Sequence, residues 1–144
     1  MMHDAFYCEQ EEKMLKGQNK NYCYFCKKLT DTAQKQIYYI LPGILIIILN
    51  RGKNNQDFNE PFRFDEILDL SNIGLNLYSY KKYFLTGIIT QLVNNGFNEH
   101  FISFCRNNMN DNFICYNDTS VTPVSIIDAM SAKIPYILIY HYIK

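Results

Sequence analysis

Four strand-like runs separated by short polar segments dominate the second half of the sequence. The runs are Tyr83 to Val93, His100 to Arg106, Phe113 to Asn117 and Pro135 to Ile143. The turns Asn94-Asn95-Gly96 and Asn107 to Asp111 are rich in residues that join adjacent antiparallel strands. Before the last run, Ser125 can cap one short helix over Ile126 to Ala132. The pattern predicts an α+β, β-rich fold around an antiparallel sheet.

The first half of the sequence contains a continuous apolar run and a CxxC pair. Gly43 to Asn50 is rich in Ile and follows Pro-Gly, which favours a strand covered on both faces. Phe62 and Phe64 alternate with a polar residue and predict a short half-buried strand. Asn21 to Ile40 predicts a hairpin with the CxxC near its tip, and residues 1–20 predict a short helix ending at Gly17. We therefore expect a lead-in element with a hairpin over 1–40, and a sheet over 41–144.

Composition excludes several functional classes. The 144 residues carry fourteen basic and fourteen acidic side chains, so no overall field draws the chain to nucleic acid or to an anionic membrane. The longest apolar run is shorter than the roughly 20 residues of a membrane-spanning helix. The amino terminus lacks the pattern of a secretory signal, and five cysteines fit reduced thiols or a metal knuckle. We expect an intracellular protein with no membrane or nucleic-acid partner.

His100 begins one predicted strand and Asn117 ends the next. A hairpin between these strands brings His100 beside Asn117 and Asp118. A general base needs such a neighbour, because a side-chain oxygen must fix the imidazole tautomer and aim the other nitrogen at a thiol. A histidine at a strand end and an Asn-Asp pair in a turn also occur without catalytic roles, so spacing alone leaves both interpretations open.

Three segments together resemble the ubiquitin-specific proteases, the papain-like thiol deubiquitinases built from fingers, palm and thumb. The first contains Tyr22 to Asp31, Gln34-Lys35-Gln36 and Leu41 to Arg51, and looks like the second zinc-knuckle half running into a palm strand. The second, Leu85 to Thr90 leading to His100 to Arg106, is similar to the histidine box. The third, Phe113 to Val121 closed by Pro135 to Tyr140, looks like the Asn/Asp box and final strand.

The resemblance implies a fold and a set of roles. The fold would be an antiparallel palm sheet with a finger hairpin, and the thumb would be missing. His100 would be the general base, Asn117 its orienting partner and Asp118 a supporting acceptor. The substrate class would be the bond after the carboxyl terminus of ubiquitin, and the partners would be ubiquitin or ubiquitinated proteins.

The sequence departs from the family pattern in its nucleophile and beside its histidine. The family's nucleophile lies in an upstream Asn-x-Cys box that this sequence does not contain. Cys8 is a poor substitute because neighbouring glutamates disfavour a thiolate, and Cys105 and Cys115 are expected to be core thiols. Asn98-Glu99 precedes His100 where the family usually has glycine, which allows close backbone approach.

The CxxC pair supplies half of a zinc site. A tetrahedral structural zinc needs four ligands, and Cys23 and Cys26 provide two. In the family the second pair lies upstream, so we expect no required cofactor, and structural zinc only if a second CxxC is supplied from upstream.

Three functional hypotheses follow. The first is the carboxyl-terminal portion of a cysteine-type deubiquitinase that lacks its nucleophile and is inactive alone. The second is a catalytically dead ubiquitin-binding module. The third is a β-rich intracellular interaction domain.

Overall fold

The chain is described here from a computed structural model, for residues 6, 11–49, 61–71, 73, 82–92, 100–107, 112–132 and 134–143. The elements in chain order are β1 (Lys13–Leu15), a 3₁₀ turn (Gly17–Asn19), β2 (Asn21–Cys23), β3 (Lys28–Thr30), β4 (Thr32–Gln34), β5 (Ile44–Ile48), β6 (Ile67–Asp69), β7 (Lys82–Leu92), β8 (His100–Arg106), β9 (Phe113–Asn117), β10 (Ser120–Val124), α2 (Ile126–Met130) and β11 (Pro135–Tyr142). No helix in these ranges is long and apolar enough to span a membrane.

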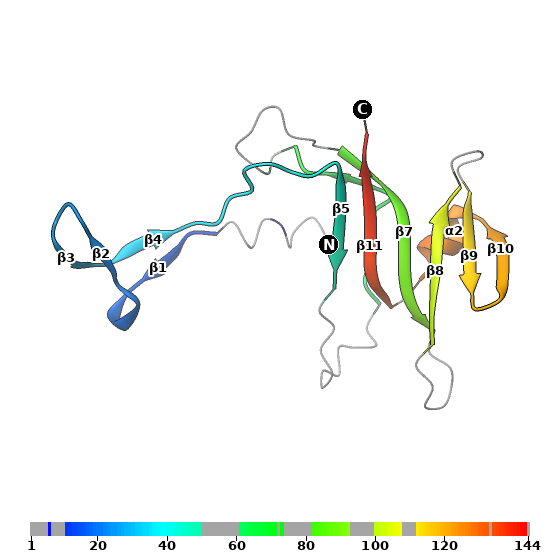
Figure 1. The fold of residues 1–144 in the computed structure, drawn as a ribbon, viewed down its shortest axis with the longest axis horizontal. Helices are drawn as coiled ribbons and strands as arrows, with labels where there is room; N and C mark the ends of the chain where they lie inside the picture. Colours follow the sequence, from blue (N-terminus) through cyan, green and yellow to red (C-terminus); the bar gives the residue numbers. More distant parts are fainter. Residues whose placement is uncertain are drawn as a thin grey trace.

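A seven-stranded antiparallel sheet forms the body of the protein. Its order is β10-β9-β8-β7-β11-β5, with β6 pairing to the first residues of β7. Strands β7 to β10 are consecutive in sequence and in space, whereas β11 pairs with β7 on one side and β5 on the other (Figure 1). This arrangement confirms the predicted β-rich α+β class and the predicted antiparallel sheet.

The core lies along the two central strands. Tyr83, Leu85 and Ile88 of β7 are at most 1% exposed, as are Leu138 and Tyr140 of β11. Tyr83 and Leu85 share one face because successive side chains of a strand point to opposite faces, and the register shift between β7 and β11 beside Thr86 moves the buried series to Ile88. Helix α2 begins as predicted after Ser125, whose Oγ accepts a hydrogen bond from the backbone N–H of Asp128 at 3.1 Å.

The segment from β1 to β4 forms an arm that projects from the sheet (Figure 1). Strands β2 and β3 make the predicted hairpin, with the CxxC turn at its tip. The predicted helix ending at Gly17 is wrong, because Lys13–Leu15 forms β1 and pairs with Thr32–Gln34. An isolated helix of only a few turns is marginally stable in water. Pairing with β4 instead gives the backbone of Lys13–Leu15 its hydrogen-bond partners. The boundary between the arm and the sheet near residue 40 stays a prediction.

Three further expectations differ from the structure. Strand β5 is covered on one face only: Leu45 and Ile47 pack against the core, whereas Ile44, Ile46 and Ile48 on the other face are more than half exposed. The predicted strand over Phe62 to Phe64 is absent, although Phe64 is buried. The strand in this part of the chain is β6, which begins at Ile67. Strand β10 was not predicted, because Ser120–Val124 is polar and contains Pro123.

Several sequence predictions fall outside the described residues. They concern Cys8, the turn Asn94-Asn95-Gly96, the Asn98-Glu99 pair and, apart from Asn107, the turn Asn107 to Asp111.

Candidate active site

His100 and Asn117 face each other across the β8–β9 hairpin. His100 is the first residue of β8 and Asn117 the last of β9. Phe104 pairs with Cys115, so the two-residue periodicity of the strands places His100 and Asn117 on the same face of the sheet. Their side chains meet there, with His100 Nε2 2.6 Å from Asn117 Oδ1. The hairpin therefore brings together the two residues that the sequence placed at its ends.

The Asn117 contact determines which imidazole nitrogen carries the proton. Because an amide oxygen only accepts hydrogen bonds, Nε2 of neutral His100 must be the donor. The lone pair then resides on Nδ1, for which no partner is found in the described part of the chain. The imidazole is part-buried, with 29% of the side chain exposed. His100 is thus oriented to accept a proton at Nδ1.

Asp118 adds a carboxylate on the same side of the ring. Its Oδ2 lies 3.8 Å from His100 Nε2, and its side chain is 79% exposed. The residue adopts a left-handed backbone with φ of 50° at the turn between β9 and β10, a conformation that Asp tolerates better than most residues. Solvent weakens this ion contact, so Asp118 is a secondary partner of His100 beside Asn117.

The described cysteines of the sheet lie away from this pair. Cys105 is on the opposite face of β8 from His100, and Cys115 lies two residues before Asn117 on β9. The expectation that Cys105 is a core thiol is wrong, because its side chain is exposed at the sheet surface, whereas Cys115 is part-buried. Partial burial raises the pKa of both thiols, which disfavours the nucleophilic thiolate.

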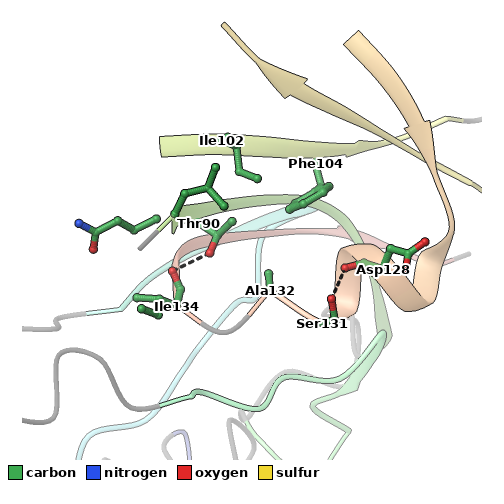
Figure 2. Close-up of a pocket in the computed structure, with 9 residues that line it drawn as sticks. Thr90, Ile102, Phe104, Asp128, Ser131, Ala132 and Ile134 are labelled. Atoms are coloured by element: carbon green, nitrogen blue, oxygen red, sulfur yellow. Dashed lines mark hydrogen bonds between the residues drawn. The ribbon is translucent and has the colours of Figure 1, made fainter. Parts of the chain in front are cut away.

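An apolar recess of about 400 Å³ lies on the face of the sheet that carries His100, although His100 does not line it (Figure 2). Its wall includes Leu92, the register partner of His100, and Ile102 and Phe104, which share the His100 face of β8. Opposite them lies Ala132, in the segment that follows α2. Thr90 Oγ1 donates to the carbonyl of Ile134 at 2.8 Å and holds this segment against β7. Sequence reasoning did not single out Leu92 or Thr90, because their nearness to His100 depends on the β7–β8 register.

Comparison with known families gives a clear assignment. The sequence model of the ubiquitin carboxyl-terminal hydrolase family matches residues 1–140. This chain belongs to that family. Two curated ubiquitin carboxyl-terminal hydrolases are similar: number 9 of Saccharomyces cerevisiae, 29% identical over 120 residues, and number 25 of Arabidopsis thaliana, 32% identical over 138 residues. The alignments cover 79% and 90% of this chain but only 16% and 20% of those relatives, so the chain matches a small part of each.

Solved structures share the fold of this ubiquitin carboxyl-terminal hydrolase family member. A chain of the SAGA DUB module Ubp8/Sgf11/Sus1/Sgf73 bound to monoubiquitin superposes with a TM-score of 0.80 at 19% identity. The same module bound to ubiquitin aldehyde gives a TM-score of 0.78 at 19% identity. Each match covers 99% of this chain and 33% of the other. The likeness extends to the arm as well as to the sheet.

The arm of this ubiquitin carboxyl-terminal hydrolase family member carries the predicted metal ligands. Cys23 Sγ accepts a hydrogen bond from the backbone N–H of Cys26 at 3.4 Å. This N–H, with that of Phe25, lowers the pKa of the Cys23 thiol, as suits a metal-binding thiolate. In the described residues, no group of three or more His, Cys, Asp or Glu side chains converges. The turn therefore fits half of a tetrahedral zinc site, and zinc binding stays a prediction.

Proposed function

We propose that this chain forms the base-bearing part of a cysteine-type deubiquitinase domain, in which His100 is the general base, Asn117 its orienting partner and Asp118 a supporting acceptor. The observation that carries the proposal is the 2.6 Å contact between His100 Nε2 and Asn117 Oδ1. Family membership supports the chemistry, and the monoubiquitin bound to a solved module of similar fold supports ubiquitin as the partner.

The reaction begins with a proton transfer to His100. A cysteine thiol gives its proton to Nδ1, and the thiolate attacks the carbonyl carbon of the terminal glycine of ubiquitin. The leaving amine takes the proton back from His100, and a thioester remains. Water then loses a proton to His100, attacks the thioester and releases ubiquitin with a free carboxylate. Asn117 holds the imidazole in the required tautomer throughout.

The thiol comes from outside the described residues. Cys105 and Cys115 lie away from His100 and have raised pKa values, and Cys23 and Cys26 are at the tip of the arm. The apolar recess lined by Leu92 and Ile102, on the same face of the sheet as His100, offers room for a segment that brings a cysteine to Nδ1. By itself this chain then binds ubiquitin without hydrolysing its conjugates.

A catalytically dead ubiquitin-binding module is the second candidate. The raised pKa values of both sheet thiols fit it as well as they fit the first candidate, since neither thiol is the nucleophile in either case. Adding a polypeptide that supplies a cysteine thiol beside Nδ1 of His100 separates the two candidates. Ubiquitin hydrolysis should appear if the chain is part of a deubiquitinase, and should not appear if it is a dead binding module.

The test uses the purified chain with a ubiquitin carboxyl-terminal fluorogenic substrate and a ubiquitin-vinyl probe. We expect saturable ubiquitin binding, no turnover and no labelled cysteine. Labelling of a cysteine of this chain, identified by mass spectrometry, contradicts the claim that its nucleophile is supplied from elsewhere. Loss of ubiquitin binding by a folded chain contradicts both candidates.

A further inference from the structure

The tip of the arm presents the most exposed aromatic side chains in the described part of the chain. Phe25 is 99% exposed and Tyr24 is 88% exposed, and both lie in the turn between β2 and β3. Leu29 and Tyr22, on the adjoining strands, are 62% and 50% exposed. The rings of Tyr22 and Tyr24 pack edge to face, with centroids 5.4 Å apart. We call these four residues the tip cluster, and no part of the proposed hydrolysis uses it.

The charge around the tip cluster is positive. Lys27 and Lys28 follow the aromatic turn and are exposed. Asp31, the nearest carboxylate in sequence, pairs with Lys20 at 3.2 Å, whereas Lys27 and Lys28 form no ion pair with any described residue. Although the net charge of the whole chain is zero, Lys27 and Lys28 form a local basic patch beside the apolar tip cluster.

We propose that the tip cluster is a peripheral docking point for an anionic lipid surface. Aromatic rings and long aliphatic side chains favour the interface between headgroups and acyl chains, and lysines near them reach lipid phosphates. The arm projects from the sheet (Figure 1), so its tip can meet a deformable lipid interface, which needs no matching cavity. The positive charge selects anionic lipid over neutral lipid.

This proposal departs from the sequence-based expectation that the chain has no membrane partner. The sequence expectation rested on net charge and on the length of apolar runs, which test for a global field and for a spanning helix. A hairpin tip needs neither, because a few side chains enter the interface while the backbone stays at headgroup level. The proposal goes beyond the proposed hydrolase function and does not depend on it.

The sequence offers a clean reporter of insertion, because the chain contains no Trp. Phe25→Trp places a single indole at the tip, and Tyr39→Trp places one at a site that is 67% exposed but lies outside the hairpin. The probe is phosphatidylcholine vesicles with or without phosphatidylserine, in reducing buffer so that Cys23 and Cys26 stay thiols. We expect a blue shift for the tip indole on phosphatidylserine vesicles only, and no shift for the Tyr39 variant.

Cosedimentation with the same vesicles measures the contributions of the rings and charges. Phe25→Ser should weaken binding about tenfold or more, because the lost ring no longer leaves water. Lys27→Asn with Lys28→Gln should weaken it about thirtyfold, since each lysine near an anionic surface contributes to the partition constant. Asn suits the left-handed backbone of Lys27, where φ is 54°. Tyr39→Ser is the matched control and should bind like the parent chain.

Four outcomes overturn the proposal. The first is the absence of cosedimentation with phosphatidylserine vesicles by a chain whose circular dichroism shows it to be folded. The second is equal binding to both vesicle types, and the third is binding that survives both tip variants. The fourth is loss of ubiquitin binding in Phe25→Ser without any vesicle binding, which makes the tip a protein contact instead.

Discussion

His100 donates from Nε2 to Asn117 Oδ1 across 2.6 Å, although the two residues are 17 positions apart in the sequence. The contact joins the first residue of β8 to the last of β9, so the position of the imidazole depends on the pairing of these strands. It also leaves the Nδ1 lone pair as the proton acceptor. The orientation of the imidazole is therefore set by residues of this chain, as the proposed role of His100 as a general base requires.

The first prediction concerns the tautomer of His100. In ¹⁵N-labelled protein, NMR should detect a slowly exchanging proton on Nε2 and an unprotonated Nδ1, because Asn117 accepts from Nε2. Asn117→Ala should lose the slow proton, and Asn117→Asp, which keeps an acceptor, should retain it. Protonation at Nδ1 in the unsubstituted protein contradicts the assigned geometry.

The second prediction ranks the cysteines by reactivity. Backbone N–H groups of Cys26 and Phe25 lower the pKa of Cys23, whereas burial raises the pKa of Cys105. At a pH below the ordinary thiol pKa, Cys23 therefore holds more thiolate and should react faster with iodoacetamide. As pH rises, the Cys23 rate should level off first. Mass spectrometry of labelled peptides measures both rates, which should become similar in denaturant; faster labelling of Cys105 in the folded chain refutes the order.

The third prediction concerns Arg106, whose side chain is only 7% exposed. Its Nε donates to the Leu85 carbonyl at 2.9 Å and a terminal nitrogen donates to Glu66 at 2.6 Å, while the guanidinium lies over the Phe84 and Phe113 rings. Arg106→Ala should lower the free energy of unfolding by about 2–4 kcal/mol, because it leaves a buried carbonyl unpaired.

Glu66→Gln is the matched control for Arg106. Glu66 is 44% exposed and returns to water, so this change should cost about 1 kcal/mol or less in urea unfolding. Equal costs for the two variants indicate that the ion pair, and not the buried guanidinium, stabilises the strand.

The fourth prediction tests the packing between β7 and β11. A Cβ added at Gly87 would lie 3.3 Å from both Cβ and Cδ1 of Ile139. Gly87→Ala should therefore destabilise the fold by about 1–3 kcal/mol. Ile139→Val removes Cδ1, so the double variant should be more stable than the sum of the single changes by about 0.5 kcal/mol or more.

Gly17→Ala provides the comparison for this cycle. At Gly17 no atom would contact the added Cβ within 4 Å, but φ is 63°, so the cost comes from backbone strain alone. The destabilisation caused by Gly17→Ala should be additive with that caused by Ile139→Val. If equilibrium unfolding shows that Gly87→Ala and Ile139→Val are also additive, the close contact between the two residues is contradicted.

Local sequence predicted part of the fold well. His100–Arg106 and Phe113–Asn117 form strands with the predicted bounds, because alternating side chains and the polar segment between them favour a hairpin. Strand β10 is not predicted, because its polar residues and Pro123 have little preference for a strand. It becomes a strand because it pairs with β9. Lys13–Leu15 was assigned to a helix because its partner, Thr32–Gln34, is distant in sequence.

The sequence by itself determined the family, the sheet-rich class and the likeness of His100, Asn117 and Asp118 to a base and its partners. Tertiary structure decided that β11 lies between β7 and β5, that one face of β5 stays exposed, and that His100 presents Nδ1. The reason is physical. Periodicity sets which side chains share a face of one strand, whereas the choice of partner and register depends on burial summed over the whole sheet.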